Sequence, residues 1–117
     1  MRTISIMLTL LFLAGCQTIT ADVAAGQVRD ITMTAKNWEF VPNEITVNNG
    51  DIVRLKVTSV DVDHGLSIPE FGIKVDLAPG KEETAEFVAD KKGEFTFVCS
   101  VPCGKGHREM KGTLVVR

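Results

Sequence analysis

Short segments in which apolar and polar side chains alternate are the feature of this sequence that most restricts its fold. In residues 53–58 (VRLKVT), three apolar side chains alternate with three charged or polar ones. An extended strand places successive side chains on opposite faces, so this pattern buries one face and leaves the other in solvent. Segments with strand character also occur at residues 31–35 (ITMTA), 44–47 (EITV), 94–99 (EFTFVC) and 112–116 (GTLVV).

Clusters of turn-forming residues separate these strands, at residues 48–51 (NNGD), 79–80 (PG) and 91–93 (KKG). Residues 81–87 (KEETAEF) indicate only a brief helical turn. From Asp30 onward the chain therefore predicts an all-β fold, either a Greek-key β-sandwich or a small barrel. Met33 is expected to pack beside Ile31 in the core. The phenylalanines expected in the core are Phe40, Phe71, Phe87, Phe95 and Phe97.

The first sixteen residues have the character of an export signal. A cationic start at Met1 and Arg2 precedes an almost wholly apolar run over residues 4–14. That run is about half of the ~20 residues that a membrane-spanning helix needs, as in a secretory signal peptide. It ends in LAGC at residues 13–16, which resembles a bacterial lipoprotein signal, in which Cys16 is lipidated and becomes the first mature residue. A plain signal peptide with an unused cysteine is the alternative.

The resemblance to a lipoprotein signal divides the chain into three parts. We expect a signal peptide over residues 1–15, a lipidated N-terminus and tether over 16–28, and one folded domain over 29–117. In such proteins the lipidated cysteine, here Cys16, usually carries more than one acyl chain, which is enough for stable membrane anchoring. The domain is then expected in the bacterial periplasm or on a surface that faces the outer membrane.

The charge of the chain argues against one large class of partner. Its formal net charge is −2, and its lysines and arginines form no long block. Neither a nucleic acid nor an anionic membrane surface is expected to bind such a chain by charge alone.

Residues 99–110 (CSVPCGKGHREM) concentrate side chains that bind soft metal ions. With a second histidine from a separate segment, the candidate ligands are His64, Cys99, Cys103, His107 and Met110. Thiolate, imidazole and thioether donors together favour copper over magnesium, calcium or manganese. Zinc also accepts two cysteines and two histidines, but zinc fingers carry the histidines on a helix that this sequence does not predict.

Two cysteines are one more than a single copper needs, because a mononuclear blue-copper site uses one cysteine, two histidines and a weak axial methionine. Two thiolates four residues apart can instead bridge two copper ions, each of which also binds one histidine. Met110 then weakly caps one copper, and a backbone carbonyl of the loop caps the other. One alternative is a structural disulfide between Cys99 and Cys103. The other is a mononuclear site that leaves Cys99 unused and has the ligands His64, Cys103, His107 and Met110.

Residues 31–116 resemble the copper domain of cytochrome c oxidase subunit II, a cupredoxin that carries the binuclear CuA centre. The ligand loop of that family has the spacing Cys-x3-Cys-x3-His-x2-Met, which residues 99–110 match at every ligand. Its first histidine lies in a segment like DVDHGLSI at 61–68, and similarity continues through NWEF at 37–40 and KVDLAPG at 74–80. The resemblance implies two copper ions whose ligands are His64, Cys99, Cys103, His107, Met110 and the backbone carbonyl of Val101.

The resemblance also implies a fold and a function. The fold is a cupredoxin-like Greek-key β-sandwich, and the function is transfer of one electron outside the cytoplasm. Catalysis is not expected, since coppers that are fully ligated by protein leave no open position for a substrate. The partner is then a redox protein such as a cytochrome c or a membrane oxidase. Periplasmic copper binding and delivery is the alternative function.

Three further positions follow from the same resemblance. In the family an aromatic residue near the position of Trp38 lies over the copper site, where electrons enter; a half-buried tryptophan of the sandwich is the alternative. Asp61 or Asp63, which flank His64, is expected to hydrogen-bond the outer ring nitrogen of that histidine; a solvated loop carboxylate is the alternative. Val101 stands where the family usually has an acidic or amide residue that contacts oxidase subunit I, and no counterpart of the two transmembrane helices of subunit II is recognised. These departures favour a free-standing or loosely associated electron carrier, with a peripheral subunit of another membrane complex as the alternative.

Overall fold

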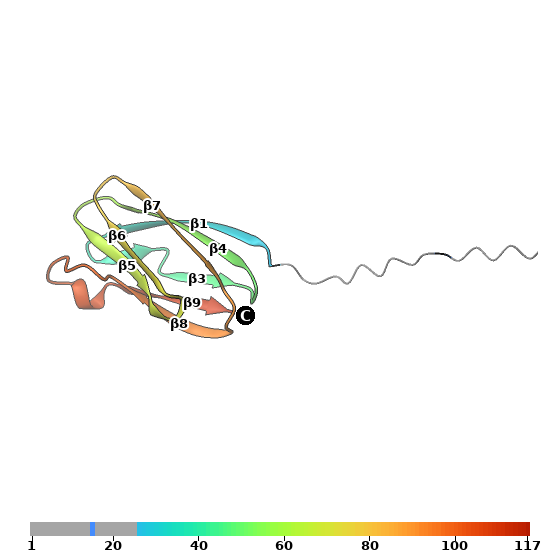
Figure 1. The fold of residues 1–117 in the computed structure, drawn as a ribbon. Helices are drawn as coiled ribbons and strands as arrows, with labels where there is room; N and C mark the ends of the chain where they lie inside the picture. Colours follow the sequence, from blue (N-terminus) through green and yellow to red (C-terminus); the bar gives the residue numbers. More distant parts are fainter. Residues whose placement is uncertain (1–14, 16–25) are drawn as a thin grey trace, which may run out of the picture.

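Two β-sheets pack face to face and enclose the core of the domain (Figure 1). The computed structural model describes Gly15 and residues 26–117. The strands in this part of the chain are β1 (Val28–Lys36), β2 (Glu39–Val41), β3 (Glu44–Val47), β4 (Ile52–Ser59), β5 (His64–Ile68), β6 (Ile73–Leu77), β7 (Glu82–Val88), β8 (Gly93–Val98) and β9 (Lys111–Val116). Two short 3-10 helices are η1 (Pro69–Phe71) and η2 (His107–Glu109). The all-β fold expected from the sequence is confirmed.

The order of the strands shows how the chain moves between the two sheets. The first sheet has the order β2-β1-β4-β7, and the second has the order β3-β9-β8-β5-β6. β1 is parallel to β4 and β3 is parallel to β9, whereas β1 with β2, β4 with β7, and β8 with β9 are antiparallel. Successive strands such as β3, β4 and β5 alternate between the sheets, so their connections cross the two ends of the sandwich. The loops gathered at one end carry the candidate ligands.

The alternating segment in β4 turns one face to the core, as its sequence predicts. Val53, Leu55 and Val57 are at most 1% exposed, and the charged residues between them lie in solvent. Met33 of β1 is equally buried and packs in the core, which confirms its expected role. Burial of each such side chain contributes about 1.5–3 kcal/mol to the free energy of unfolding before entropic costs.

Aromatic rings fill both the middle and the margin of the core. Phe40 and Phe97 are buried and meet edge to face, with ring centroids 5.4 Å apart. Phe71 and Phe95 are only partly buried, and they pack on each other and on the core at its margin, where Phe71 also contacts Phe87. The sequence prediction that all five are core residues therefore holds fully for the three buried rings and partly for the other two.

The prediction of a brief helical turn at residues 81–87 is wrong, because this segment forms β7. Ala85 and Phe87 are buried while the glutamates around them point outward, a period of two rather than of a helix. They lie opposite Leu55 and Val53 of the neighbouring strand. Packing of these apolar side chains against β4 outweighs the weak helical preference of a Lys- and Glu-rich sequence.

The sequence pattern also does not predict β2, β5 and β6. The reason is clearest for β5, which is buried at four of its five residues and so shows no alternation. A strand covered on both faces cannot be recognised from a period of two. This strand begins with His64, one of the candidate ligands.

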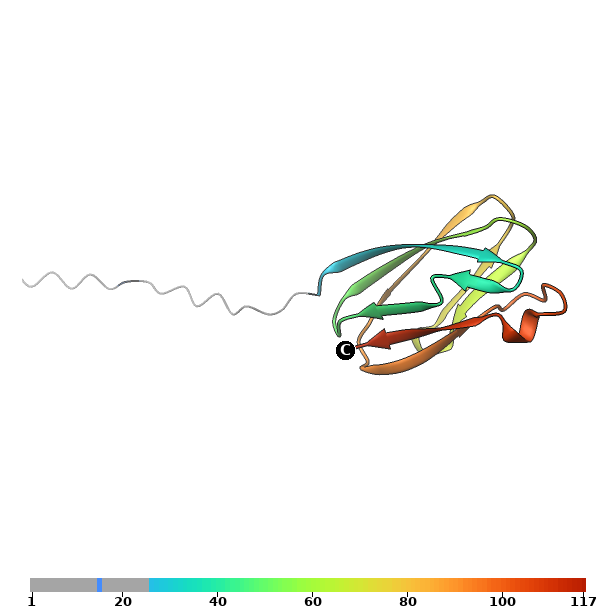
Figure 2. The same ribbon diagram turned by 180° about the vertical axis from the view of Figure 1, so that it is seen from behind.

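The two ends of the sandwich carry different parts of the chain. β1 begins, and the chain ends, at one end, whereas residues 99–110 lie at the opposite end (Figures 1 and 2). At the first end the buried carboxylate of Asp51 accepts hydrogen bonds from the backbone N–H groups of Asn48 and Gln27, at 2.8 and 3.1 Å. The bond from Asn48 is the main influence that lowers the pKa of Asp51, against the opposite effect of burial. These contacts fix the start of the domain far from the candidate ligands.

The predicted export signal over residues 1–15, lipidation of Cys16 and most of the predicted tether over residues 16–28 lie outside the described residues. They therefore stay predictions. Within the described part of the chain, no helix is long and apolar enough to cross a membrane.

Candidate metal centre

Two segments far apart in the sequence bring the five candidate ligands together. His64 is the first residue of β5, and the other four lie in the loop between β8 and β9. β5 is antiparallel to β8, with Ser67 opposite Val98, so the start of β5 lies beside the point where the loop leaves β8. The backbone N–H of Cys99 donates to the carbonyl of Met110 at 3.0 Å and closes the base of the loop.

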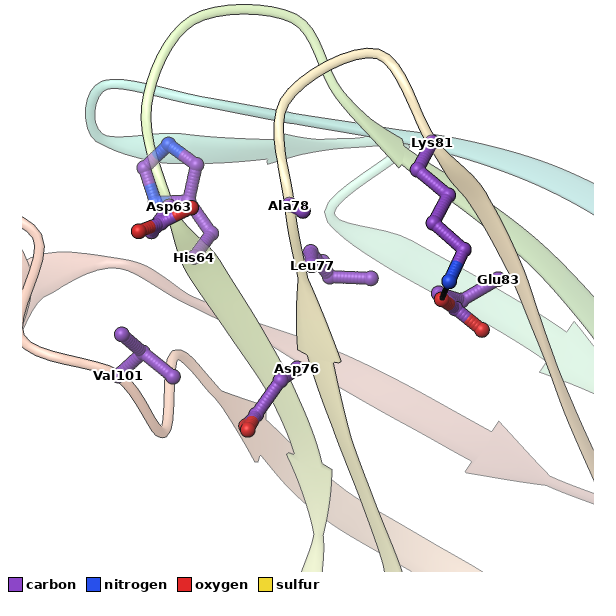
Figure 3. A pocket seen from close by; sticks show the side chains of 8 residues that line it. All are labelled: Asp63, His64, Asp76, Leu77, Ala78, Lys81, Glu83 and Val101. Atoms are coloured by element: carbon purple, nitrogen blue, oxygen red, sulfur yellow. Dashed lines mark ion pairs between the residues drawn. The ribbon is translucent and has the colours of Figure 1, made fainter.

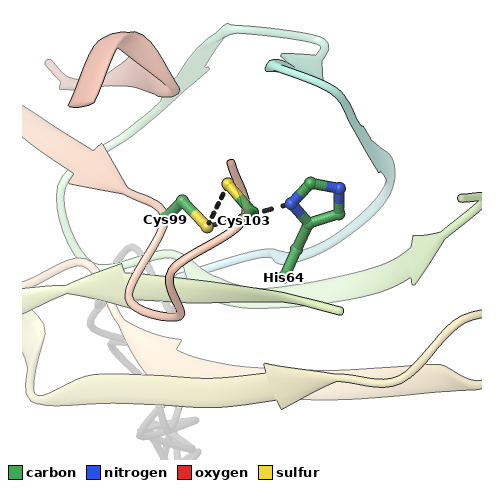
Figure 4. A group of neighbouring side chains, drawn as sticks. All are labelled: His64, Cys99 and Cys103. Atoms are coloured by element: carbon green, nitrogen blue, oxygen red, sulfur yellow. Dashed lines mark hydrogen bonds between the residues drawn. The ribbon is translucent and has the colours of Figure 1, made fainter. Parts of the chain in front are cut away.

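The two cysteine sulfurs lie at the middle of the site (Figure 4). Their Sγ atoms are 3.5 Å apart, far longer than the ~2.05 Å of a disulfide bond, and both thiols are free. On one side Nδ1 of His64 lies 3.9 Å from Sγ of Cys99, and on the other Nδ1 of His107 lies 3.4 Å from Sγ of Cys103. Each sulfur therefore has an imidazole nitrogen of its own.

Two weaker donors complete the site. Sδ of Met110 lies 3.8 Å from Sγ of Cys103, and the backbone carbonyl oxygen of Val101 lies 3.1 Å from Sγ of Cys99. The structure thus gathers the whole donor set expected from the sequence. Three sulfurs, two imidazole nitrogens and one carbonyl oxygen form a predominantly soft set that fits copper.

Burial distinguishes the ligands from one another. Cys99, Cys103 and Met110 are buried, and His64 is completely so, whereas His107 is half-exposed. Of the side-chain ligands, His107 is therefore the one most accessible to solvent.

Burial and the neighbouring Cys99 raise the pKa of the Cys103 thiol from its ordinary value of 9.0 to about 12. Two buried thiolates so close together repel each other and lose hydration, which disfavours the doubly ionised site. A bound cation reverses this balance, because it compensates the negative charge directly. The Cys103 thiol is thus expected to be protonated in the absence of a metal ion and ionised when one binds.

Of the two aspartates considered from the sequence, Asp61 contacts the buried histidine. Its Oδ1 lies 2.7 Å from Nε2 of His64. The same carboxylate accepts the backbone N–H groups of Asn37 at 2.7 Å and Val62 at 2.6 Å. Burial acts to raise the pKa of Asp61, but the hydrogen bonds that it accepts outweigh burial and lower the pKa below its ordinary value. Asp63 is exposed.

Asp63 lines a hollow of about 380 Å³ beside β5 (Figure 3). Asp76 and the side chain of Val101 also line it, together with an ion pair of 3.2 Å between Lys81 and Glu83. The candidate ligand His64 also lines it, but its other polar groups are carboxylates and an ammonium, which do not favour a soft metal ion.

Trp38 lies against the ligand loop, as the resemblance implies. Its indole Nε1–H donates to the backbone carbonyl of Cys103 at 3.1 Å, and the side chain is 40% exposed. The ring packs so closely on Gly106 that a Cβ there would lie 2.4 Å from Cγ of the tryptophan. Whether electrons enter through this side chain stays a prediction, but its structural contact with the loop is direct.

Gly65 is a residue of the site that sequence reasoning missed. A Cβ at this position would lie 2.2 Å from Oγ of Ser100, so the absence of a side chain lets the ligand loop approach β5. The signal in the sequence was a glycine directly after a candidate ligand, inside a segment without turn character.

The contact between Trp38 and Gly106 gives a first prediction. Gly106→Ala must push the indole or the loop aside; its φ of −93° suits any residue, so backbone strain is not the cause. We expect copper release to become about tenfold faster, since groups that position metal ligands typically change affinity by 10- to 100-fold. Emission from the single tryptophan should shift in the same variant. Lys105→Ala, at the neighbouring exposed position of the same loop, serves as the control. Unchanged emission and release in Gly106→Ala alone would contradict the packing.

A two-sheet β-sandwich that presents two cysteines, two histidines and a methionine at one end defines a copper protein of the cupredoxin class. The chain belongs to the cupredoxin-like domain family, whose model matches residues 5–116.

Comparison with known proteins places oxidase subunits among the similar chains. Cytochrome c oxidase subunit 2 of Thermus thermophilus is 37% identical over 78 residues, which are 67% of this chain and 58% of that protein. Nitrous-oxide reductase of Stutzerimonas stutzeri is 33% identical over 90 residues, 74% of this chain and 14% of that enzyme. The chain thus spans little more than half of the oxidase subunit and a small part of the reductase.

Among solved structures, the periplasmic domain of cytochrome oxidase subunit II from Bradyrhizobium japonicum superposes with a TM-score of 0.70 at 30% identity. The match covers 75% of this chain and 83% of that domain. The described strands therefore correspond to most of a separate domain, and the cupredoxin-like fold expected from the sequence is confirmed.

Proposed function

We propose that this domain is an electron carrier that uses a binuclear, CuA-type copper centre outside the bacterial cytoplasm. One observation carries the proposal: two free cysteine sulfurs lie 3.5 Å apart, and each has a different histidine Nδ1 within 4 Å. A mononuclear site has no use for the second sulfur, and a structural disulfide has no use for the histidines.

In this proposal Cys99 and Cys103 bridge two copper ions. His64 binds one of them and His107 the other. Met110 and the carbonyl of Val101 act as the weak outer donors. When bound, the copper pair supplies a one-electron couple.

The protein contributes positions that do not change between the two redox states. Cys99 directly follows β8, Met110 directly precedes β9, and His64 is the first residue of β5. Ligands held by paired strands move little when the charge of the site changes, so little must rearrange during electron transfer. Burial of the sulfurs keeps water from the bridging atoms. The half-exposed edge of His107 is the place where a redox partner approaches most closely.

The partner in this proposal is a redox protein such as a cytochrome c or a membrane oxidase. Similarity to a periplasmic domain of an oxidase subunit supports both the kind of partner and an extracytoplasmic location. Attachment to the membrane through a lipid on Cys16 completes the proposal and rests on the sequence alone. Val101 in place of an acidic or amide residue favours a carrier that associates loosely with its partner.

Copper reconstitution of the reduced protein without residues 1–16 tests the proposal. We expect a purple protein with two coppers per chain and an EPR spectrum of seven hyperfine lines, since the unpaired electron is shared by two equivalent nuclei of spin 3/2. One copper and four lines would identify a mononuclear cupredoxin instead. Reversible one-electron voltammetry with slow metal exchange distinguishes a carrier from a copper-delivery protein, which must release its metal readily.

A further inference from the structure

The turn between β1 and β2 contacts both ligand-bearing segments at once. Its two residues, Asn37 and Trp38, are adjacent in the chain. The backbone N–H of Asn37 donates to Oδ2 of Asp61, in the loop before β5. The indole N–H of Trp38 donates to the carbonyl of Cys103, in the loop after β8. One turn without any ligand of its own therefore joins the two segments that carry all the ligands.

The first contact reaches His64 through Asp61. Oδ2 of the carboxylate is held by Asn37 at 2.7 Å, and Oδ1 lies 2.7 Å from Nε2 of the histidine. An ionised carboxylate only accepts hydrogen bonds, so Nε2 must carry the proton. The lone pair is then on Nδ1, the atom that faces Sγ of Cys99 at 3.9 Å. Asp61 thereby selects the tautomer in which the buried imidazole can bind a metal.

The second contact holds the backbone of Cys103. Sγ of this residue lies within 4 Å of three other ligand atoms, Sγ of Cys99, Nδ1 of His107 and Sδ of Met110. The indole reaches its carbonyl at 3.1 Å and lies against the glycines on either side of Lys105. Because Gly104 and Gly106 follow Cys103 in the loop, the backbone after it has little intrinsic stiffness. The indole of Trp38 restrains this part of the backbone.

We propose that Asn37, Trp38 and Asp61 form a positioning clasp that sets His64 and Cys103 in their metal-binding arrangement before copper arrives. The inference rests on the proposed copper function and deepens it. Trp38 and Asp61 bind no metal in this assignment. They act through the ligands that they hold, and the two contacts work as one unit because both end on the same turn.

Two conservative variants each remove one contact. Asp61→Asn keeps the size of the side chain but offers an oxygen on only one side, so it cannot accept from both Asn37 and His64. Trp38→Phe keeps an aromatic ring on the loop but has no N–H to donate. Asp63→Asn is the matched control, since it removes an exposed carboxylate from the same loop.

The first measurement uses reduced, metal-free protein. Nitrogen-15 NMR of the His64 ring should show the Nε2–H tautomer in the wild-type protein and in Asp63→Asn, and a mixture of tautomers in Asp61→Asn. A merely structural role of Asp61 would lower the melting temperature but leave the tautomer unchanged. Wild-type tautomer populations in Asp61→Asn would overturn the clasp.

The second measurement follows transfer of copper from the reduced, loaded protein to a strong copper(I) chelator. Each single variant should release copper about 10- to 100-fold faster than wild type, as for other groups that orient metal ligands. The double variant should be little faster than the worse single variant, because breaking either contact frees the same turn. Wild-type release rates, or single effects that multiply in the double variant, would overturn the clasp as one unit.

The two proposals fail in different ways. A wild-type protein that does not bind two coppers contradicts the proposed function, while the tautomer of His64 in metal-free protein still tests the clasp. A wild-type protein with two coppers whose variants behave like Asp63→Asn contradicts the clasp alone.

Discussion

Cys103→Ser should reduce the bound copper from two ions per chain to at most one and abolish the purple colour. Sγ of Cys103 lies between the other sulfur at 3.5 Å and Nδ1 of His107 at 3.4 Å, so no other side-chain atom can take its bridging position. A serine hydroxyl is a harder donor and stays protonated at neutral pH, which makes it a poor bridge between soft ions. Copper analysis and EPR check this result, with seven hyperfine lines replaced by four or by none.

Met110→Leu is the matched control for this substitution. Its side chain is buried, and an apolar exchange of similar volume costs less than about 1.5 kcal/mol in stability. The variant removes a sulfur that caps the site without bridging it, so two coppers and seven lines should persist while the reduction potential shifts. If Cys103→Ser also keeps two coppers and seven lines, the bridging role is wrong and the mononuclear alternative gains support.

Copper loading should weaken at least tenfold for each unit that the pH falls below neutrality. The pKa of Cys103 is raised to about 12, so its thiol is protonated at neutral pH and must release a proton when it binds a metal ion. Each proton displaced makes the apparent affinity change tenfold per pH unit. Competition with a copper(I) chelator between pH 6 and 8, in protein kept reduced, measures the slope. Affinity that does not change over this range would show that the thiol is already ionised.

The stability of the metal-free protein should also depend on pH, in the alkaline range. Because folding raises the pKa of Cys103, its contribution to stability is complete below the ordinary value of 9.0 and is lost as the pH rises toward 12. The melting temperature of metal-free protein should therefore fall over this alkaline range. Cys103→Ser removes that group and is the control, so its melting temperature should fall less.

The fold is predictable from sequence where one face of a strand is buried and the other is exposed to solvent. β4 is the clear case, because Val53, Leu55 and Val57 alternate with exposed residues. The same logic fails for β5, whose residues are nearly all buried. It also fails for β7, because its many glutamates hide the alternation of Ala85 and Phe87. In that strand the pairing with β4 decides the outcome, and pairing between distant segments is not visible in a local pattern.

The candidate ligands can be predicted from the sequence, whereas the contacts that support them cannot. Spacing alone points to Cys99, Cys103, His107 and Met110, because all four lie in one loop whose length limits their separation. The choice between Asp61 and Asp63 depends on how the loop before β5 meets the turn that contains Asn37. The hydrogen bond from Trp38 to Cys103 joins residues 65 positions apart. Such contacts are set by the packing of whole strands and therefore require the structure.

The opposite placement of chain ends and ligand loops has a practical consequence for electrochemistry. The backbone of Arg117 is hydrogen-bonded to Asn49 at 2.7 Å, at the end of the sandwich remote from residues 99–110 (Figures 1 and 2). A short affinity handle added after Arg117 fastens the domain to a conducting surface with its ligand loops facing the solution. A handle inserted in the exposed turn between β6 and β7, which follows the residue opposite His64, instead turns the same loops toward the surface. Electrodes prepared in these two orientations offer the same protein to a soluble redox partner from opposite sides.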